Sequence, residues 1–150
     1  MFKKENIIKI QILFICLIAV SCVGKPPTTI GNYTDCPDKP NCVSTKNSYS
    51  TTYIEPIRYD GSRAEAKKLL LLTLESFGVS SIKNEKDNFI YVEFVSKIFG
   101  FVDDVEFYFN KPGVIEFRSA SRIGYSDLGV NRNRMESIRS KFNVLAKSEM

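Results

Sequence analysis

Apolar positions between residues 63 and 77 recur every three or four residues, a spacing that predicts an amphipathic helix. Ser62 and Glu65 form a capping-box pattern at its start, and Gly78 is a typical stop signal after its end. The predicted buried stripe consists of Ala66, Leu69, Leu70, Thr73 and Phe77. We expect this stripe to pack in the core.

After this helix the apolar period changes to two, which predicts strands. Residues 79–84 and 88–96 flank a polar turn at 85–87, and residues 105–110 and 114–122 flank a loop at 111–113. An earlier strand is predicted within residues 51–59, and Pro56 favours an edge position for it because proline cannot donate to a ladder.

The alternation also predicts the register of the last hairpin. Directly opposed residues lie on the same face, so a loop of an odd number of residues is required. A three-residue loop pairs Phe109 with Ile115 and Phe107 with Phe117. The same register pairs Glu106 with Arg118, Tyr108 with Glu116, Asp103 with Ser121, and Asp104 with Ala120 beside Arg122.

A second amphipathic helix is predicted from Asn131 to Lys147. Asn131 is a suitable N-cap, and Val130 with Met135 fit a hydrophobic staple. Its apolar stripe consists of Met135, Ile138, Phe142 and Leu145. Together these elements predict one α+β domain over residues 36–147, with two layers: a mainly antiparallel sheet of about five strands and two helices packed on it, in the order β-α-β-β-β-β-α.

Residues 1–21 have the pattern of a lipoprotein-type signal peptide. A basic start precedes a mostly apolar run of twelve residues, shorter than the roughly 20 residues that a membrane-spanning helix needs. Small residues at 19 and 21 precede Cys22, which predicts lipidation of Cys22. The alternatives are an ordinary cleaved signal and a retained anchor helix. Residues 22–35 are rich in proline, glycine and threonine and predict a tether.

This start places the domain in the bacterial cell envelope, lipid-anchored and outside the cytoplasm, on the outer membrane or the periplasmic face. In such a compartment Cys36 and Cys42, separated by two prolines and an asparagine, are expected to form a disulfide. Metal binding and redox chemistry are the alternatives, but the chain has no histidine for a zinc set and lacks C-x-x-C spacing. We expect no metal and no cofactor.

Charge and composition exclude several function classes. Removal of residues 1–21 takes away three lysines and one glutamate, which lowers the net charge from +4 to +2. This value is too small to indicate a nucleic-acid-binding domain. The absence of histidine excludes Ser–His–Asp and Cys–His nucleophile systems, and no phosphate-binding glycine motif is present.

Four arginines lie close together in the predicted arrangement, with several carboxylates near them. Arg132 and Arg134 are predicted in the first turn of the last helix, where the helix dipole disfavours cations, so we expect an anion beside them. One interpretation is a structural network of ion pairs, and the other is a pocket for a phosphate, carboxylate or sugar acid. The candidate residues are Arg118, Arg122, Arg132, Arg134, Asp103, Asp104 and Asp127.

Four segments, "CPDKPNCVST", "YIEPIRY", "FGFVDDVEFYF" and "RSASRIGYSDLGVNRNR", occur in this order. Together they resemble the successive signatures of domain-of-unknown-function family 1499, from about Cys36 to Phe142. Thr45 departs from the family pattern, which often has serine there. The resemblance implies a single domain of an exported protein behind a lipid anchor. It implies no catalytic residue, because the family has none agreed.

The sequence therefore favours a membrane-anchored envelope protein with a binding or accessory role rather than an enzyme. Its expected partners are the membrane, through the N-terminal lipid, and a small anionic ligand or another envelope protein. The alternative is a small hydrolase or transferase that acts on an anionic envelope metabolite held by the arginines.

Overall fold

A computed structural model of the chain describes residues 24–78 and 82–148. The elements follow in the order β1 (Cys42–Ser44), β2 (Ile57–Arg58), α2 (Arg63–Ser76), β3 (Ile82–Lys86), β4 (Phe89–Val95), β5 (Val102–Lys111), β6 (Val114–Ser121) and α3 (Val130–Ser148). The predicted α+β class and element order are confirmed. The predicted signal peptide, residues 1–21, and the predicted lipidation site, Cys22, lie outside the described residues.

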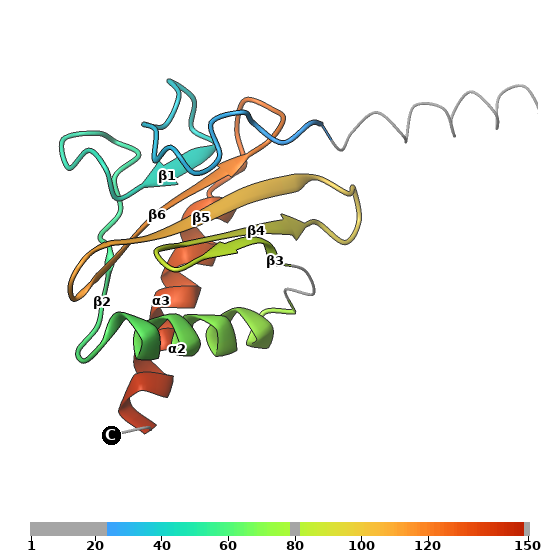
Figure 1. Cartoon of the computed structure of the whole chain (residues 1–150). Coiled ribbons are helices and arrows are strands. Elements are labelled where there is room, and N and C mark those ends of the chain that lie inside the picture. The colour runs from blue at the N-terminus through green and yellow to red at the C-terminus, as the bar shows by residue number, and fades with distance from the viewer. Residues whose placement is uncertain (1–23, 79–81, 149–150) are drawn as a thin grey trace, which may run out of the picture.

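The strands form one sheet in the order β1-β6-β5-β4-β3, and β2 also pairs with β6, so the sheet has six strands instead of about five. All of these strand pairs are antiparallel. β1 is the strand that the sequence pattern misses, because three residues are too few to show a period of two. Figure 1 shows both helices on one side of this sheet.

The predicted register of the β5–β6 hairpin is confirmed from Asp103 to Tyr108 of β5. Phe107 pairs with Phe117, Glu106 with Arg118, and Tyr108 with Glu116. The predicted three-residue loop is wrong, because Lys111 pairs with Val114 and leaves only two residues at the turn. A register shift between Tyr108 and Lys111 absorbs the extra residue, so the interior pairing survives an even loop.

The helix-facing side of the sheet carries the main apolar core. Fully buried phenylalanines from β5, β6 and α3 meet α2 there. The α2 capping box forms as predicted: Ser62 accepts from the Glu65 N–H, and Glu65 accepts from the Ser62 N–H. Phe77 is the C-cap of this helix and is 37% exposed, so the prediction of its burial is wrong; Leu74 is buried within the helix instead.

Helix α3 begins at Val130, one residue before the predicted cap. Asp127 caps it: its carboxylate accepts from the Gly129 N–H at 3.0 Å and from the Asn131 N–H at 2.7 Å. An anion at this position also complements the helix dipole. Asn131 is therefore helical and fully buried, and the prediction of it as the N-cap is wrong.

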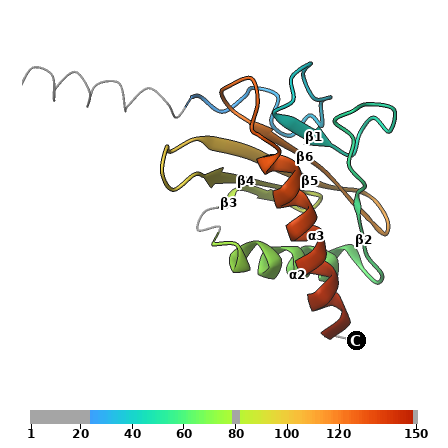
Figure 2. The same ribbon diagram turned by 180° about the vertical axis from the view of Figure 1, so that it is seen from behind.

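The other side of the sheet is covered in part by the N-terminal segment, residues 24–41, drawn in blue and cyan in Figure 1 and seen from behind in Figure 2. Gly31 donates its N–H to Glu106 at 2.7 Å, and Tyr33 donates its N–H to the Tyr108 hydroxyl at 3.0 Å. From Gly24 onward, this segment is thus attached to the sheet, although its composition predicts a tether.

Candidate functional site

The face of the sheet opposite the helices is polar and largely buried. Because side chains alternate across a strand, every second residue of β4, β5 and β6 points to this face. The buried charged residues there include Asp104, Glu106, Glu116 and Arg118. Buried charges are costly unless they are paired and hydrogen-bonded, so their partners determine what this face can do.

Arg122 forms the most extensive set of contacts on this face. Its guanidinium donates to both Asp104 oxygens, at 3.1 and 2.5 Å, and to Glu93 at 2.5 Å. Tyr91 donates its hydroxyl to the same Asp104 carboxylate at 2.6 Å. The hydrogen bonds to Asp104, the largest cause, raise the pKa of Arg122 despite its burial. Burial and the hydrogen bond to Asp104 likewise raise the pKa of Tyr91.

Glu106 is the centre of a second cluster. Its carboxylate accepts from Tyr108 at 2.5 Å and from the Gly31 N–H, and both of these bonds fall on Oε2. Arg118 reaches the other oxygen, Oε1, at 3.4 Å, as the register predicts, but this contact is much longer than those of Arg122. Burial raises the pKa of Tyr108. Tyr33 packs on the Tyr108 ring, and burial raises the pKa of Tyr33 to about 12.

Arg134 and Asp103 lie on the helix-facing side and pair at 2.5 Å. Arg134 also donates to the Asn131 side chain at 2.7 Å, and its guanidinium lies 4.7 Å from the centre of the Phe94 ring. These contacts attach the first turn of α3 to the end of the sheet, so Asp103 supplies the anion that the sequence predicts beside Arg134.

Arg132 and Asp127 do not pair with each other or with the remaining candidates. Arg132 donates to the backbone carbonyls of Thr51 and Tyr53, at 3.2 and 2.9 Å. Asp127 is used for the cap of α3. Of the seven candidates, the structure therefore brings together Arg122 with Asp104 and Arg134 with Asp103, and it places Arg118 on Glu106.

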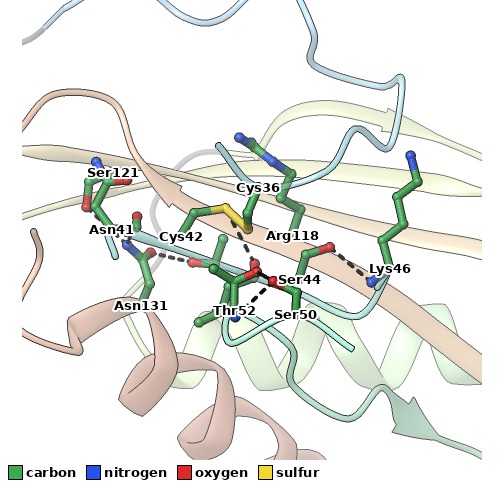
Figure 3. Close-up of a disulfide and its surroundings, with 12 residues drawn as sticks. Cys36, Asn41, Cys42, Ser44, Lys46, Ser50, Thr52, Arg118, Ser121 and Asn131 are labelled. Atoms are coloured by element: carbon green, nitrogen blue, oxygen red, sulfur yellow. Dashed lines mark hydrogen bonds between the residues drawn. A yellow bond between two sulfur atoms is a disulfide. The ribbon is translucent and has the colours of Figure 1, made fainter. Parts of the chain in front are cut away.

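Cys36 and Cys42 form the predicted disulfide, with the sulfurs 2.08 Å apart. Figure 3 shows the disulfide and the Arg118 side chain on one side of β6, with Asn131 of α3 on the other. Six positions separate the two cysteines, so the disulfide closes a short loop, and Lys39 and Asn41 of this loop line a cavity at the end of the sheet.

A cavity of about 190 Å³ lies between this disulfide loop and the end of β6. Its lining includes Lys39, Arg118 and Arg122; the one acid among its described lining residues, Asp104, is already bonded to Arg122. Glu93 also pairs with Arg122, and Glu106 with Arg118, so Lys39 is the one cation of the lining without an ion pair among the described residues. Asn41 also lines it, beside Ser121 and Gly124.

Two groups in this lining lack partners within residues 24–78 and 82–148. Arg118 Nε and Asn41 Oδ1 are buried without a hydrogen bond. Arg118 Nη2 also makes no hydrogen bond among these residues, because the single contact of this guanidinium runs from Nη1 to Glu106. An unsatisfied buried polar group costs about 1–3 kcal/mol. A bound molecule that forms hydrogen bonds with these groups would therefore recover part of that free energy.

Sequence reasoning missed several members of this face, notably Tyr91, Glu93, Lys39 and Asn41. For the first two a signal existed, because strand alternation places Tyr91 and Glu93 on the side opposite the apolar Ile90 and Val92. Lys39 and Asn41 lie in a loop, where no periodicity indicates direction.

Within the described part of the chain, no group of three or more histidine, cysteine, aspartate or glutamate residues is placed to hold a metal ion. No helix in the same residues is both long enough and apolar enough to cross a membrane. The chemistry that this face offers is hydrogen bonding and charge.

The sequence profile of one protein family, described as "Protein of unknown function (DUF1499)", matches residues 32–142, which are 111 of the 150 residues. The chain belongs to this family. Comparison with curated proteins and with solved structures gives no match. The DUF1499 region includes the disulfide loop, β5, β6 and the first two thirds of α3, so all of the cavity lining except Pro27 falls within it.

Proposed function

We propose that this DUF1499 protein is a lipid-anchored protein of the bacterial cell envelope whose domain binds a small anionic ligand in the cavity beneath the Cys36–Cys42 loop. The observation that carries the proposal is Arg118. Its side chain is 9% exposed, it lines the cavity together with Lys39, and only one nitrogen of its guanidinium has a partner among the described residues.

The unpartnered groups define the chemistry of the ligand. Arg118 Nη2 and the ammonium of Lys39 are donors suited to a phosphate or carboxylate. Asn41 Oδ1 is an acceptor and requires a hydroxyl or amine. The volume of the cavity is that of about six water molecules, which suits one anionic group on a short hydroxylated carbon chain, such as a glycerol phosphate or a sugar acid.

The location in the envelope is supported by two features. The first is the signal pattern that ends at Cys22. The second is the Cys36–Cys42 disulfide, because disulfides persist outside the reducing cytosol. A lipid on Cys22 attaches the domain to a membrane, with the binding cavity in the extracytoplasmic space.

Thermal unfolding with and without ligand tests the binding function. At ten times its dissociation constant, a ligand specific for the folded state stabilises it by about 1.4 kcal/mol, which raises Tm by about 4 °C for a domain of this size. We expect glycerol 3-phosphate or gluconate to raise the Tm of the mature protein and uncharged glycerol to leave it unchanged.

Three variants localise the effect. Arg118→Gln should abolish the rise, and Lys39→Gln, whose side chain lies at the surface, should reduce it without risk to folding. Arg63→Gln removes the same charge from an exposed pair outside the cavity and should retain the full rise. Absence of any rise in the wild type, or an equal rise in all variants, contradicts the proposed site.

A further inference from the structure

The loop between β4 and β5, residues 96–101, exposes a cluster of large apolar side chains. Ile98 is 85% exposed, Phe99 69% and Phe101 44%, and Val95, at the end of β4, is 60% exposed. The rings of Phe99 and Phe101 lie 5.7 Å apart, so these two side chains form one apolar patch. Single exposed apolar residues are ordinary, whereas a contiguous group on one loop marks an interaction surface.

The backbone of this loop is internally hydrogen-bonded. Ser96 donates its N–H to the Phe101 carbonyl at 2.8 Å, and Gly100 donates its N–H to the Ser96 carbonyl at 3.0 Å. The Phe101 N–H reaches the Ser96 hydroxyl at 2.9 Å. These three bonds fix the turn that presents the exposed side chains of Ile98 and Phe99.

This loop lies at the end of the sheet where the N-terminal segment begins. Arg122 donates a side-chain hydrogen bond to the Gly24 carbonyl at 3.4 Å, and its N–H reaches the carbonyl of Val102, the first residue after the loop. Figures 1 and 2 both show the blue start of the segment and the β4–β5 loop at the same end of the molecule.

Only Val23 separates Gly24 from Cys22. Consecutive Cα atoms lie about 3.8 Å apart, so Cys22 is within about 8 Å of Gly24 in any conformation. A lipid on Cys22 therefore holds this end of the sheet at the membrane surface, whatever the path of the intervening residue.

From these contacts we infer that the loop 96–101 inserts Ile98, Phe99 and Phe101 into the interfacial layer of the membrane that holds the lipid anchor. This inference rests on the proposed anchor at Cys22. Lys25 and Lys97 are both exposed at this end of the molecule and match anionic headgroups. The loop would fix the orientation of the domain on the bilayer.

Tryptophan fluorescence tests the contact, because the chain contains no tryptophan. The full lipid-anchored protein is reconstituted into vesicles of phosphatidylethanolamine and phosphatidylglycerol, with and without brominated lipid. One variant is Phe99→Trp. The control is Tyr49→Trp, an aromatic position that is 99% exposed on the loop between β1 and β2. Figures 1 and 2 show this loop and the β4–β5 loop at opposite ends of the molecule.

We expect the tryptophan at position 99 to emit at shorter wavelength in vesicles and to be quenched by brominated lipid, and the tryptophan at position 49 to do neither. Quenching at both positions, or at neither while the protein floats with the vesicles, overturns the loop contact and leaves the anchor intact. Protein that does not float with the vesicles contradicts the anchor itself, and with it this inference.

Discussion

The Asp104 carboxylate accepts two hydrogen bonds from the Arg122 guanidinium, one from Nε at 3.1 Å and one from Nη2 at 2.5 Å. Both side chains are almost fully buried, at 1% and 4% exposure, and Tyr91 donates a third bond to the same carboxylate. This pair joins β5 to the chain that leaves β6, beside the proposed cavity.

Asp104→Asn should therefore destabilise the domain by about 3–5 kcal/mol, because it leaves the Arg122 charge buried with fewer anionic partners. Asp87→Asn is the matched control: Asp87 is 96% exposed and pairs with Arg63 at 3.6 Å, so its loss should cost less than about 1 kcal/mol. Urea unfolding measures both. Equal effects of the two substitutions would show that the Arg122–Asp104 pair contributes no more than a surface pair.

Glu93 should make stability depend on acid pH. Burial alone would raise its pKa, but hydrogen bonds, first of all that from Arg122, outweigh burial and lower it. A carboxyl group with a lowered pKa in the folded state stabilises the fold above its unfolded pKa, about 4.3, and loses this contribution as the pH falls through the folded pKa.

We therefore expect the free energy of unfolding of the wild type to fall more steeply below about pH 5 than that of Glu93→Gln. Urea unfolding at a series of pH values gives the two slopes. Parallel curves for the two proteins would contradict the assigned role of Glu93.

The Cys36–Cys42 disulfide should stabilise the domain by about 2 kcal/mol, the chain-entropy value for so short a loop. Reductant should lower the free energy of unfolding of the wild type by that amount and leave a double Cys36→Ser, Cys42→Ser variant unchanged. If reductant leaves the free energy of unfolding of the wild type unchanged, the disulfide does not contribute to stability.

Cys22 should carry the lipid. Cys22→Ala should lose the incorporation of labelled palmitate and leave the membrane fraction, because stable anchoring takes more than one acyl chain and the variant has none. Palmitate labelling that persists in this variant would exclude Cys22 as the attachment site.

The sequence predicts most of the sheet because its signals are local. The alternation of Phe107 and Phe117 with charged neighbours determines the β5–β6 register, and Ser62 with Glu65 marks the start of α2. Those signals depend on neighbouring residues, so they can be interpreted without knowledge of the fold.

The cavity could not be predicted in the same way, because its contacts join residues far apart in the chain. The Gly31 N–H reaches Glu106 across 75 positions, which explains why a segment with the composition of a tether covers the sheet. The register predicts correctly that Arg118 meets Glu106. It does not predict that Tyr108 and Gly31 both bond to Oε2 of that carboxylate, or that Arg118 lies 3.4 Å from Oε1.

A crystal structure of the mature protein with glycerol 3-phosphate tests the central claim most directly. The account predicts phosphate oxygens about 3 Å from Arg118 Nη2 and from the Lys39 ammonium, with a ligand hydroxyl at the same distance from Asn41 Oδ1. A cavity that contains no phosphate at saturating ligand, with Arg118 and Asn41 bonded to other protein groups, would contradict it.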